Sequence, residues 1–121
     1  MKLISTKPDA KKFAKEWINS WNSHDIKKVL RHYSDDVEIR SPMIKLVAGI
    51  ESGSLKGKVL VSDYWEKALK RMPELHFELV DVAEGEDSIA LYYTSVMNKM
   101  SIEVMFFNKK GKVSKVFAHY T

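Results

Sequence analysis

The 121-residue chain contains no cysteine, which excludes disulfide bonds and thiolate chemistry and makes a reducing cytoplasm the default location. No apolar run approaches the roughly 20 residues of a membrane-spanning helix. The N-terminus, "MKLISTKPDAKKF", lacks the apolar segment of a secretory signal peptide. We therefore expect a cytoplasmic protein with no membrane partner.

Motifs for phosphate, metal or serine chemistry are incomplete. "GSLKGK" at 53–58 is one residue shorter between its glycines than a phosphate-binding loop, and Val59 follows where that loop has Ser or Thr. "GIESG" at 49–53 displaces the serine of a nucleophile elbow by one position. No two of the four histidines lie three or four residues apart, as metal ligands on a helix do. We expect neither a metal nor a cofactor.

An excess of negative charge is also absent, because the formal net charge is +4. The lysines are spread along the whole chain and form no single cluster. Such diffuse positive charge mainly affects solubility and non-specific association. We therefore expect no nucleic-acid partner.

Three segments have apolar residues at helical spacing, and they are residues 5–23, 25–34 and 58–72. Thr6 and Asp9 have the spacing of a capping box, and Pro8 between them suits a first helical turn. The second segment is capped by either Ser23 or Asp25. Pro73 ends the third segment.

The stretch "SDDVEIRSP" at 34–42 tests whether clustered carboxylates form an acid–base site. Two aspartates favour a turn, and the apolar residues then alternate with period two. Val37, Ile39 and Ser41 share the inward face, so Glu38 points outward beside Arg40. This pattern indicates a turn followed by a strand.

The rest of the chain is predicted to be β-structure. Residues 43–57 fit a short strand and a glycine-rich loop, and four strands of a meander follow at 75–82, 89–97, 101–107 and 113–120. The whole chain, 1–121, is predicted to be one α+β domain, in which three helices from the N-terminal half cover one face of a curved antiparallel sheet.

Both faces of the strand at 101–107 are largely apolar. Glu103 shares one face with Met105 and Phe107, while the opposite face carries Ile102, Val104 and Phe106. Because the helices cover only one face of the sheet, the apolar second face would be exposed to water unless another subunit covers it. We expect a homodimer that buries this outer face.

The chain is rich in Trp and Tyr, which have a large apolar body and a hydrogen-bonding tip. Together they suit an amphipathic cavity for a small molecule. The residues that we expect to line this pocket are Trp17, Tyr33, Ser41, Trp65, Tyr92, Glu103, Met105 and Tyr120.

Three stretches, "WNSHDIKKVLRHYSDDVEIRSP", "GSLKGKVLVSDYWEKALKRMPELHFE" and "EVMFFNKKGKVSKVFAHY", resemble the SnoaL-like branch of the nuclear-transport-factor-2-like superfamily. The resemblance implies a cone in which a curved sheet wraps three helices around one internal pocket. It also implies dimerisation through the outer sheet face. The family includes ketosteroid isomerase, polyketide cyclases, epoxide hydrolases and dehydratases, so the fold alone does not fix the function.

Compared with the isomerase pattern, this chain has an incomplete site. Trp17 stands where the resemblance implies an oxyanion tyrosine, Ser41 where it implies the aspartate base, and Trp65 where it implies a supporting tyrosine. Glu103 alone matches in type, because the isomerase holds a protonated carboxylic acid there. An unassisted serine is not a general base at neutral pH.

Three functions therefore remain open. The first is binding of an apolar, steroid- or polyketide-like molecule. The second is an isomerase, dehydratase, cyclase or hydrolase that uses Glu103 as its only catalytic acid or base. The third is a dimeric interaction module without a functional pocket. Burial should raise the pKa of Glu103 and leave its carboxyl partly protonated near neutral pH.

Overall fold

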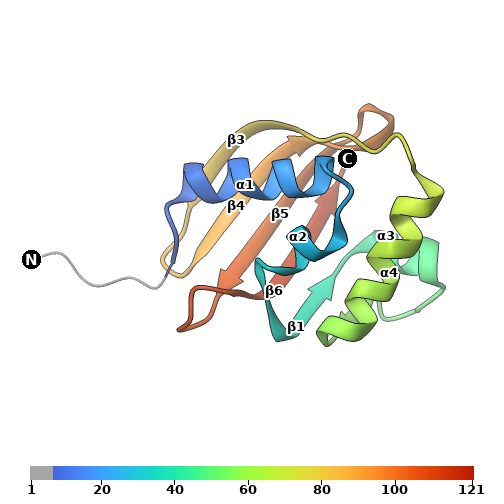
Figure 1. Cartoon of the computed structure of the whole chain (residues 1–121), viewed down its shortest axis with the longest axis horizontal. Coiled ribbons are helices and arrows are strands. Elements are labelled where there is room, and N and C mark those ends of the chain that lie inside the picture. The colour runs from blue at the N-terminus through green and yellow to red at the C-terminus, as the bar shows by residue number, and fades with distance from the viewer. Residues whose placement is uncertain (1–6) are drawn as a thin grey trace, which may run out of the picture.

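The structure is a computed structural model that describes residues 7–121. Its helices are α1 (Ala10–Asn22), α2 (Ile26–Leu30), α3 (Pro42–Ala48) and α4 (Lys58–Arg71), with a short 3-10 helix, η1 (Val96–Asn98). Its strands are β1 (Tyr33–Arg40), β2 (Ser54–Lys56), β3 (Glu78–Glu84), β4 (Ser88–Thr94), β5 (Met100–Phe107) and β6 (Val113–Tyr120) (Figure 1). The predicted α+β class and C-terminal meander are confirmed.

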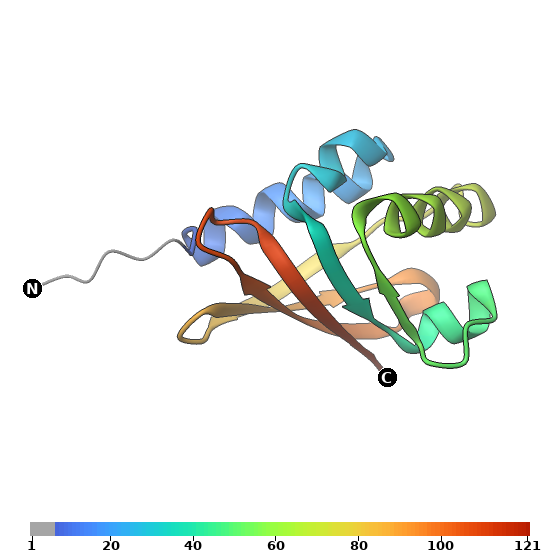
Figure 2. The same cartoon turned by 90° about the horizontal axis from the view of Figure 1, so that it is seen from below.

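The six strands form one sheet in the order β2-β1-β6-β5-β4-β3. Every pairing is antiparallel except that of β1 with β6, so the expectation of a wholly antiparallel sheet was wrong at this position. Parallel neighbours need a long connection, and here α4 and the strands of the meander separate β1 from β6 in the chain. The sheet curves but stays open between its edge strands β2 and β3 (Figure 2).

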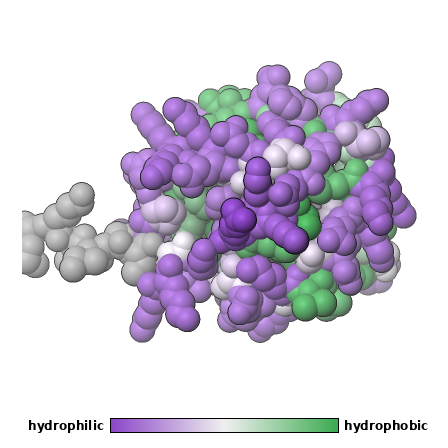
Figure 3. Space-filling view, viewed as in Figure 1, coloured by the Kyte–Doolittle hydropathy of each residue, from purple (hydrophilic) through white to green (hydrophobic). Residues whose placement is uncertain are grey.

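Helices α1, α2 and α4 lie on the same side of the curved sheet (Figure 2). Their outward sides are mostly polar, with Val59 and Leu60 of α4 as exposed apolar exceptions, and apolar residues show only in small separate areas on the face seen in Figure 3. The inward sides carry the large aromatic residues, among them Phe13, Trp17 and Trp21 of α1. This arrangement buries one continuous core between the helices and the inner face of the sheet.

Helix α1 begins later than predicted. The Asp9 side chain caps it by accepting a hydrogen bond from the backbone N–H of Lys12 at 2.9 Å. Pro8 therefore precedes the cap and does not occupy the first turn. Thr6, the other half of the predicted capping box, lies outside the described residues.

Helix α2 is shorter than predicted. Asp25 caps it through the backbone N–H of Lys27, but the helix ends at Leu30, and Tyr33 already belongs to β1. The backbone N–H of Val113 donates to the His32 carbonyl at 2.8 Å. The chain after Leu30 therefore pairs with β6 and does not continue the helix. The two aspartates at 35–36 consequently lie within β1, where both are exposed, and not in a turn.

Helix α3 differs from the strand and loop that the sequence predicted for residues 43–57. The Ser41 hydroxyl caps this helix by accepting from the backbone N–H of Met43 at 3.1 Å, and Pro42 fills its first position. Gly49 ends it in the left-handed conformation with φ of 69°. The fold therefore has four α-helices among its described residues instead of three.

The faces of β1 are as the alternation predicted. Val37, Ile39 and Ser41 are buried, while Glu38 turns outward and pairs with Arg40 at 3.5 Å. The predicted inward face of β5 is also confirmed, since Met105 is fully buried.

Candidate functional site

A cavity of about 300 Å³ opens between α3, α4 and the inner face of the sheet. The side chains around it are mostly apolar and aromatic, as in small-molecule sites generally. Its wall consists of Trp21 from α1; Tyr33 and Ile39 from β1; Ser41, Pro42, Met43, Leu46 and Val47 around α3; Tyr64, Trp65, Ala68, Met72, Leu75 and Phe77 from α4 and the segment after it; Tyr93, Ser95, Val96, Met97 and Lys99 from β4 and its connection; Glu103 from β5; and Val116, Ala118 and Tyr120 from β6.

Glu103 is the carboxylate of this cavity wall. It sits in the middle of the sheet, where β5 pairs with β4 at Leu91 and with β6 at Ala118. Burial raises the pKa of Glu103 from the ordinary 4.5 to about 7. The hydroxyl of Tyr93 donates to its Oε1 at 3.0 Å, which opposes that rise in pKa but does not cancel it. The direction of this shift is the one that burial of the carboxyl predicts.

Four tyrosines surround this carboxylate from different elements. Burial, and then the charge of Glu103, raise the pKa values of Tyr33, Tyr64, Tyr93 and Tyr120, with Tyr64 reaching about 12. All four hydroxyls therefore stay protonated near neutral pH. They give the Glu103 end of the cavity polar groups that carry no charge.

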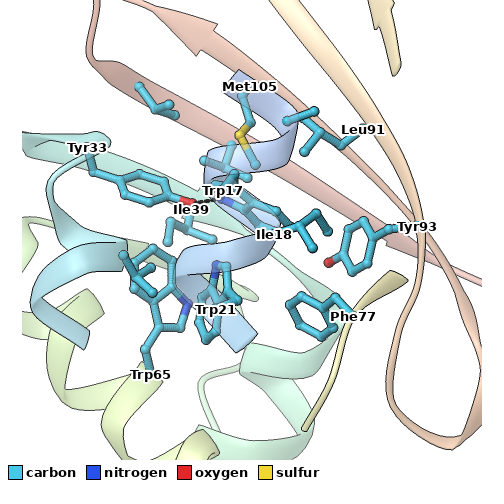
Figure 4. Packing of buried hydrophobic residues seen from close by; sticks show 14 of the residues in the cluster. Trp17, Ile18, Trp21, Tyr33, Ile39, Trp65, Phe77, Leu91, Tyr93 and Met105 are labelled. Atoms are coloured by element: carbon cyan, nitrogen blue, oxygen red, sulfur yellow. Dashed lines mark hydrogen bonds between the residues drawn. The ribbon is translucent and has the colours of Figure 1, made fainter. Parts of the chain in front are cut away.

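Aromatic residues of the cavity wall form a continuous row that runs from Tyr33 to Tyr93 (Figure 4). Ring centroids lie 4.9 Å apart between Tyr33 and Trp65, and 5.1 Å apart between Trp65 and Trp21. The row continues from Trp21 to Phe77 at 5.8 Å and from Phe77 to Tyr93 at 4.7 Å. These spacings are those of attractive edge-to-face and tilted ring pairs.

Trp17 stands behind this row. Its indole Nε1–H donates to the Tyr33 hydroxyl oxygen at 2.7 Å (Figure 4), and both residues are buried. This bond fixes the position of the Tyr33 ring in the wall. The neighbouring Trp21 Nε1–H is also buried and makes no hydrogen bond to residues 7–121.

Five of the eight residues predicted to line the pocket do lie on the cavity wall, namely Tyr33, Ser41, Trp65, Glu103 and Tyr120. Three lie elsewhere. Trp17 is behind the wall, and Met105 is packed in the core below it. Tyr92 points to the outer face of the sheet and is 38% exposed.

Tyr93 takes the place that was expected for Tyr92. Adjacent residues of a strand face opposite sides, and Ile89, Leu91 and Tyr93 form the buried set of β4. The apolar alternation of Ile89 and Leu91 was the sequence signal for this assignment.

The mouth of the cavity was missed by sequence reasoning, because α3 was missed. Leu46 of α3 and Met97 of η1 both line the cavity and are both 78% exposed. Met97 and Asn98 also have left-handed backbone conformations, with φ of 56° and 57°. The rim is thus built from a short helix and an irregular turn, neither of which leaves a strong hydrophobic period.

Ser41 makes the departure from the isomerase pattern clear in structural terms. Its hydroxyl accepts the capping hydrogen bond of α3 and contacts the Tyr120 hydroxyl, which stays protonated near neutral pH and is no base. Within the cavity wall, Glu103 is therefore the group with a pKa suited to proton transfer near pH 7.

Within residues 7–121, no three His, Cys, Asp or Glu side chains gather closely enough to hold a metal ion. Nor does that part of the chain contain a helix that is both long and apolar enough to cross a membrane.

Comparison with known proteins agrees with this architecture. A crystal structure of a SnoaL-like protein of unknown function from Burkholderia thailandensis is 43% identical, with a TM-score of 0.90 and 93% of each chain covered. An NTF2-like protein of unknown function from Cytophaga hutchinsonii is 14% identical, with a TM-score of 0.70, and the match covers 100% of this chain and 95% of that one.

A third structure is that of SalBIII, described as an epoxide hydrolase/cyclase-like enzyme in pyran ring formation in the polyether salinomycin. It is 14% identical, with a TM-score of 0.70, and the match covers 93% of this chain and 90% of SalBIII. At such identities the likeness shows the fold alone. No curated protein matches the chain. The family model of the SnoaL-like domain matches residues 14–121. The chain therefore belongs to the SnoaL-like domain family and has the NTF2-like fold.

Proposed function

We propose that the protein binds a small, largely apolar molecule, of steroid-like or polyketide-like character, in the cavity described above. The observation that carries this proposal is the position of Glu103, a carboxyl group on the wall of an otherwise apolar and aromatic cavity. Burying such a group destabilises a fold unless it is used or satisfied, and Tyr93 supplies its one hydrogen bond from residues 7–121.

When it is protonated, the Glu103 carboxyl group anchors the ligand through a hydrogen bond. With a pKa of about 7, a substantial fraction of Glu103 is neutral in the physiological range, and a neutral carboxyl donates one O–H hydrogen bond. Because Tyr93 donates to Oε1, the carboxyl proton has its place on Oε2. The ligand therefore needs an accepting oxygen, such as a carbonyl, attached to an apolar body.

The pH dependence of binding tests this proposal with two matched probes, 1-tetralone and tetralin, which differ by the carbonyl oxygen. At pH 5.5 the ketone should bind more tightly than the hydrocarbon in calorimetry. At pH 8.5 only about 3% of Glu103 is neutral, so ketone binding should weaken by up to about 30-fold. Tetralin binding should stay constant.

The Glu103→Gln variant should make ketone binding independent of pH, because the amide is a permanent donor. Glu38→Gln is the matched control, since that carboxylate lies on the outward side of β1. Ketone binding that does not respond to pH in the unmodified protein would contradict the role of Glu103.

A second candidate is an enzyme in which Glu103 acts as the only acid or base. The observation that favours it is the same pKa near 7, which suits a general acid or base at neutral pH. Exchange of the C2 protons of 1-tetralone in D₂O, followed by NMR, separates the two functions. Exchange that is faster than in buffer and is lost in Glu103→Gln supports the enzyme. Binding without exchange supports the binding protein.

We also propose that the outer face of the sheet is a homodimer interface, as expected from Ile102, Val104 and Phe106. Ile102 is 45% exposed there, and Tyr92 lies opposite it on β4. Phe106 and Phe117 pack edge-to-face beside them, with centroids 5.7 Å apart. Such a set of apolar residues on an uncovered sheet face is typical of a protein contact.

The remaining alternative is an interaction module in which the pocket has no role. The carboxyl group on the cavity wall does not favour this alternative, because a pocket without a role needs no such group.

A further inference from the structure

The Glu103 carboxylate has no cationic partner within the described chain. No lysine, arginine or histidine of residues 7–121 forms a salt bridge with it. Lys99 is the basic residue of the cavity wall, but it lies at the exposed rim, and its Nζ is 3.5 Å from the Thr121 carbonyl oxygen. Arg40 pairs with Glu38 at 3.5 Å on the outward side of β1.

The groups that face Glu103 from the neighbouring elements are all uncharged. They are the hydroxyls of Tyr33 from β1, Tyr64 from α4, Tyr93 from β4 and Tyr120 from β6. Above pH 7 the carboxylate is mostly ionised, and it then has no salt-bridge partner among residues 7–121. A buried charge is stable when an opposite charge pairs with it, and residues 7–121 supply none here.

Aromatic rings form much of the cavity wall, and two of them, Tyr33 and Tyr93, also face Glu103. The row from Tyr33 through Trp65, Trp21 and Phe77 to Tyr93 belongs to this wall, and the π-systems of such rings attract cations electrostatically. Tryptophan is the best of these partners, and desolvated sites give the strongest attraction. A carboxylate in the same cavity as such rings has the composition of a site for a quaternary or tertiary ammonium group.

We propose that the cavity, with Glu103 ionised, takes a hydrophobic ammonium ion, in which Glu103 is the counter-ion and aromatic rings of the cavity wall lie beside the cationic head. This inference rests on the proposed function, because it assumes that the cavity admits small molecules. It adds a second ligand class to the same site. The protonated site takes an accepting oxygen, and the ionised site takes a cation.

The test compares phenyltrimethylammonium with tert-butylbenzene, which has the same shape but carbon in place of nitrogen. A cavity that is merely apolar prefers the hydrocarbon, because the cation loses more hydration on entry. At pH 8.5 the ammonium ion should bind about 10-fold more tightly than the hydrocarbon. At pH 5.5 its affinity should fall by up to about 30-fold, because about 3% of Glu103 is then ionised.

The Glu103→Gln variant should lose the preference for the ammonium ion and keep tert-butylbenzene binding, while the control Glu38→Gln should keep both. A readout without any variant is the pKa of Glu103 by carboxyl-carbon NMR, which the ammonium ion should lower. Hydrocarbon binding without an ammonium preference at pH 8.5, or an unchanged Glu103 pKa, would overturn this inference and leave the proposed function standing. If neither tert-butylbenzene nor 1-tetralone bound, both would fail.

Discussion

Replacing Glu103 with glutamine should make the protein more stable at alkaline pH. The pKa of Glu103 in the folded protein is raised by burial, from the ordinary 4.5 to about 7. The folded state therefore holds the proton more tightly than the unfolded chain does. The corresponding stability is fully present below pH 4.5 and is lost as the pH rises through 7.

The size of this effect follows from the two pKa values. One pH unit of pKa difference corresponds to about 1.4 kcal/mol, so the difference between 4.5 and about 7 corresponds to about 3 kcal/mol. The native protein should lose about this much unfolding free energy between pH 4 and pH 8.5. Glu103→Gln carries no titrating group at this position and should not share the loss. This amount is a large fraction of the stability of an ordinary domain.

Urea unfolding of both proteins across this pH range, followed by far-UV circular dichroism, measures the difference. Subtraction removes the other titrating groups, notably His32, whose pKa is lowered mainly by burial and whose contribution is lost as the pH falls. A difference in unfolding free energy that stays constant between pH 4 and pH 8.5 would show that Glu103 is solvated, and the reasoning on its buried carboxyl would be refuted.

Three further changes have defined outcomes. Tyr93→Phe removes the hydrogen bond that lowers the pKa of Glu103, so carboxyl-carbon NMR should find that pKa higher than in the unmodified protein; a lower value would contradict the contact. Phe106→Lys places a charge on the outer sheet face and should convert the dimer into a monomer, as measured by light scattering at tens of micromolar. An unmodified protein that is already monomeric at this concentration would exclude the proposed interface. Trp17→Phe leaves the Tyr33 hydroxyl without its donor and should lower the unfolding free energy by about 1–3 kcal/mol in urea titrations, whereas an unchanged value would show that the buried bond is dispensable.

The strands of the meander could be predicted from sequence because their periodicity is strong. The alternation of Glu103 with Met105 correctly places the carboxyl on the inner face of the sheet. Helix α3 was harder, because seven residues span only about two turns, and their apolar residues also fit a strand. Its capping signals, Ser41 at the start and Gly49 at the end, were more informative than its hydrophobic pattern.

The side chains that form the cavity were predictable only in part. Residue type alone favoured Tyr92 and Trp17, but whether an aromatic ring lines a cavity depends on which way it turns from its backbone. Tyr92 and Tyr93 are neighbours in sequence and face opposite sides of the sheet. Trp17 lies on the buried face of α1, yet it does not line the cavity and instead donates to the hydroxyl of Tyr33, which does. The orientations of Tyr92 and Trp17 therefore depend on contacts with residues that are distant in the sequence.

The aromatic row also gives the protein an optical signature. Its five rings come from α1, β1, α4, β4 and the segment that links α4 to β3, so they hold a fixed mutual geometry only while these elements are packed together. Rings in a fixed asymmetric environment produce near-UV circular dichroism, which vanishes when specific packing is lost even if the helices and strands remain. The near-UV spectrum of this chain is therefore a direct monitor of whether the cavity wall is assembled.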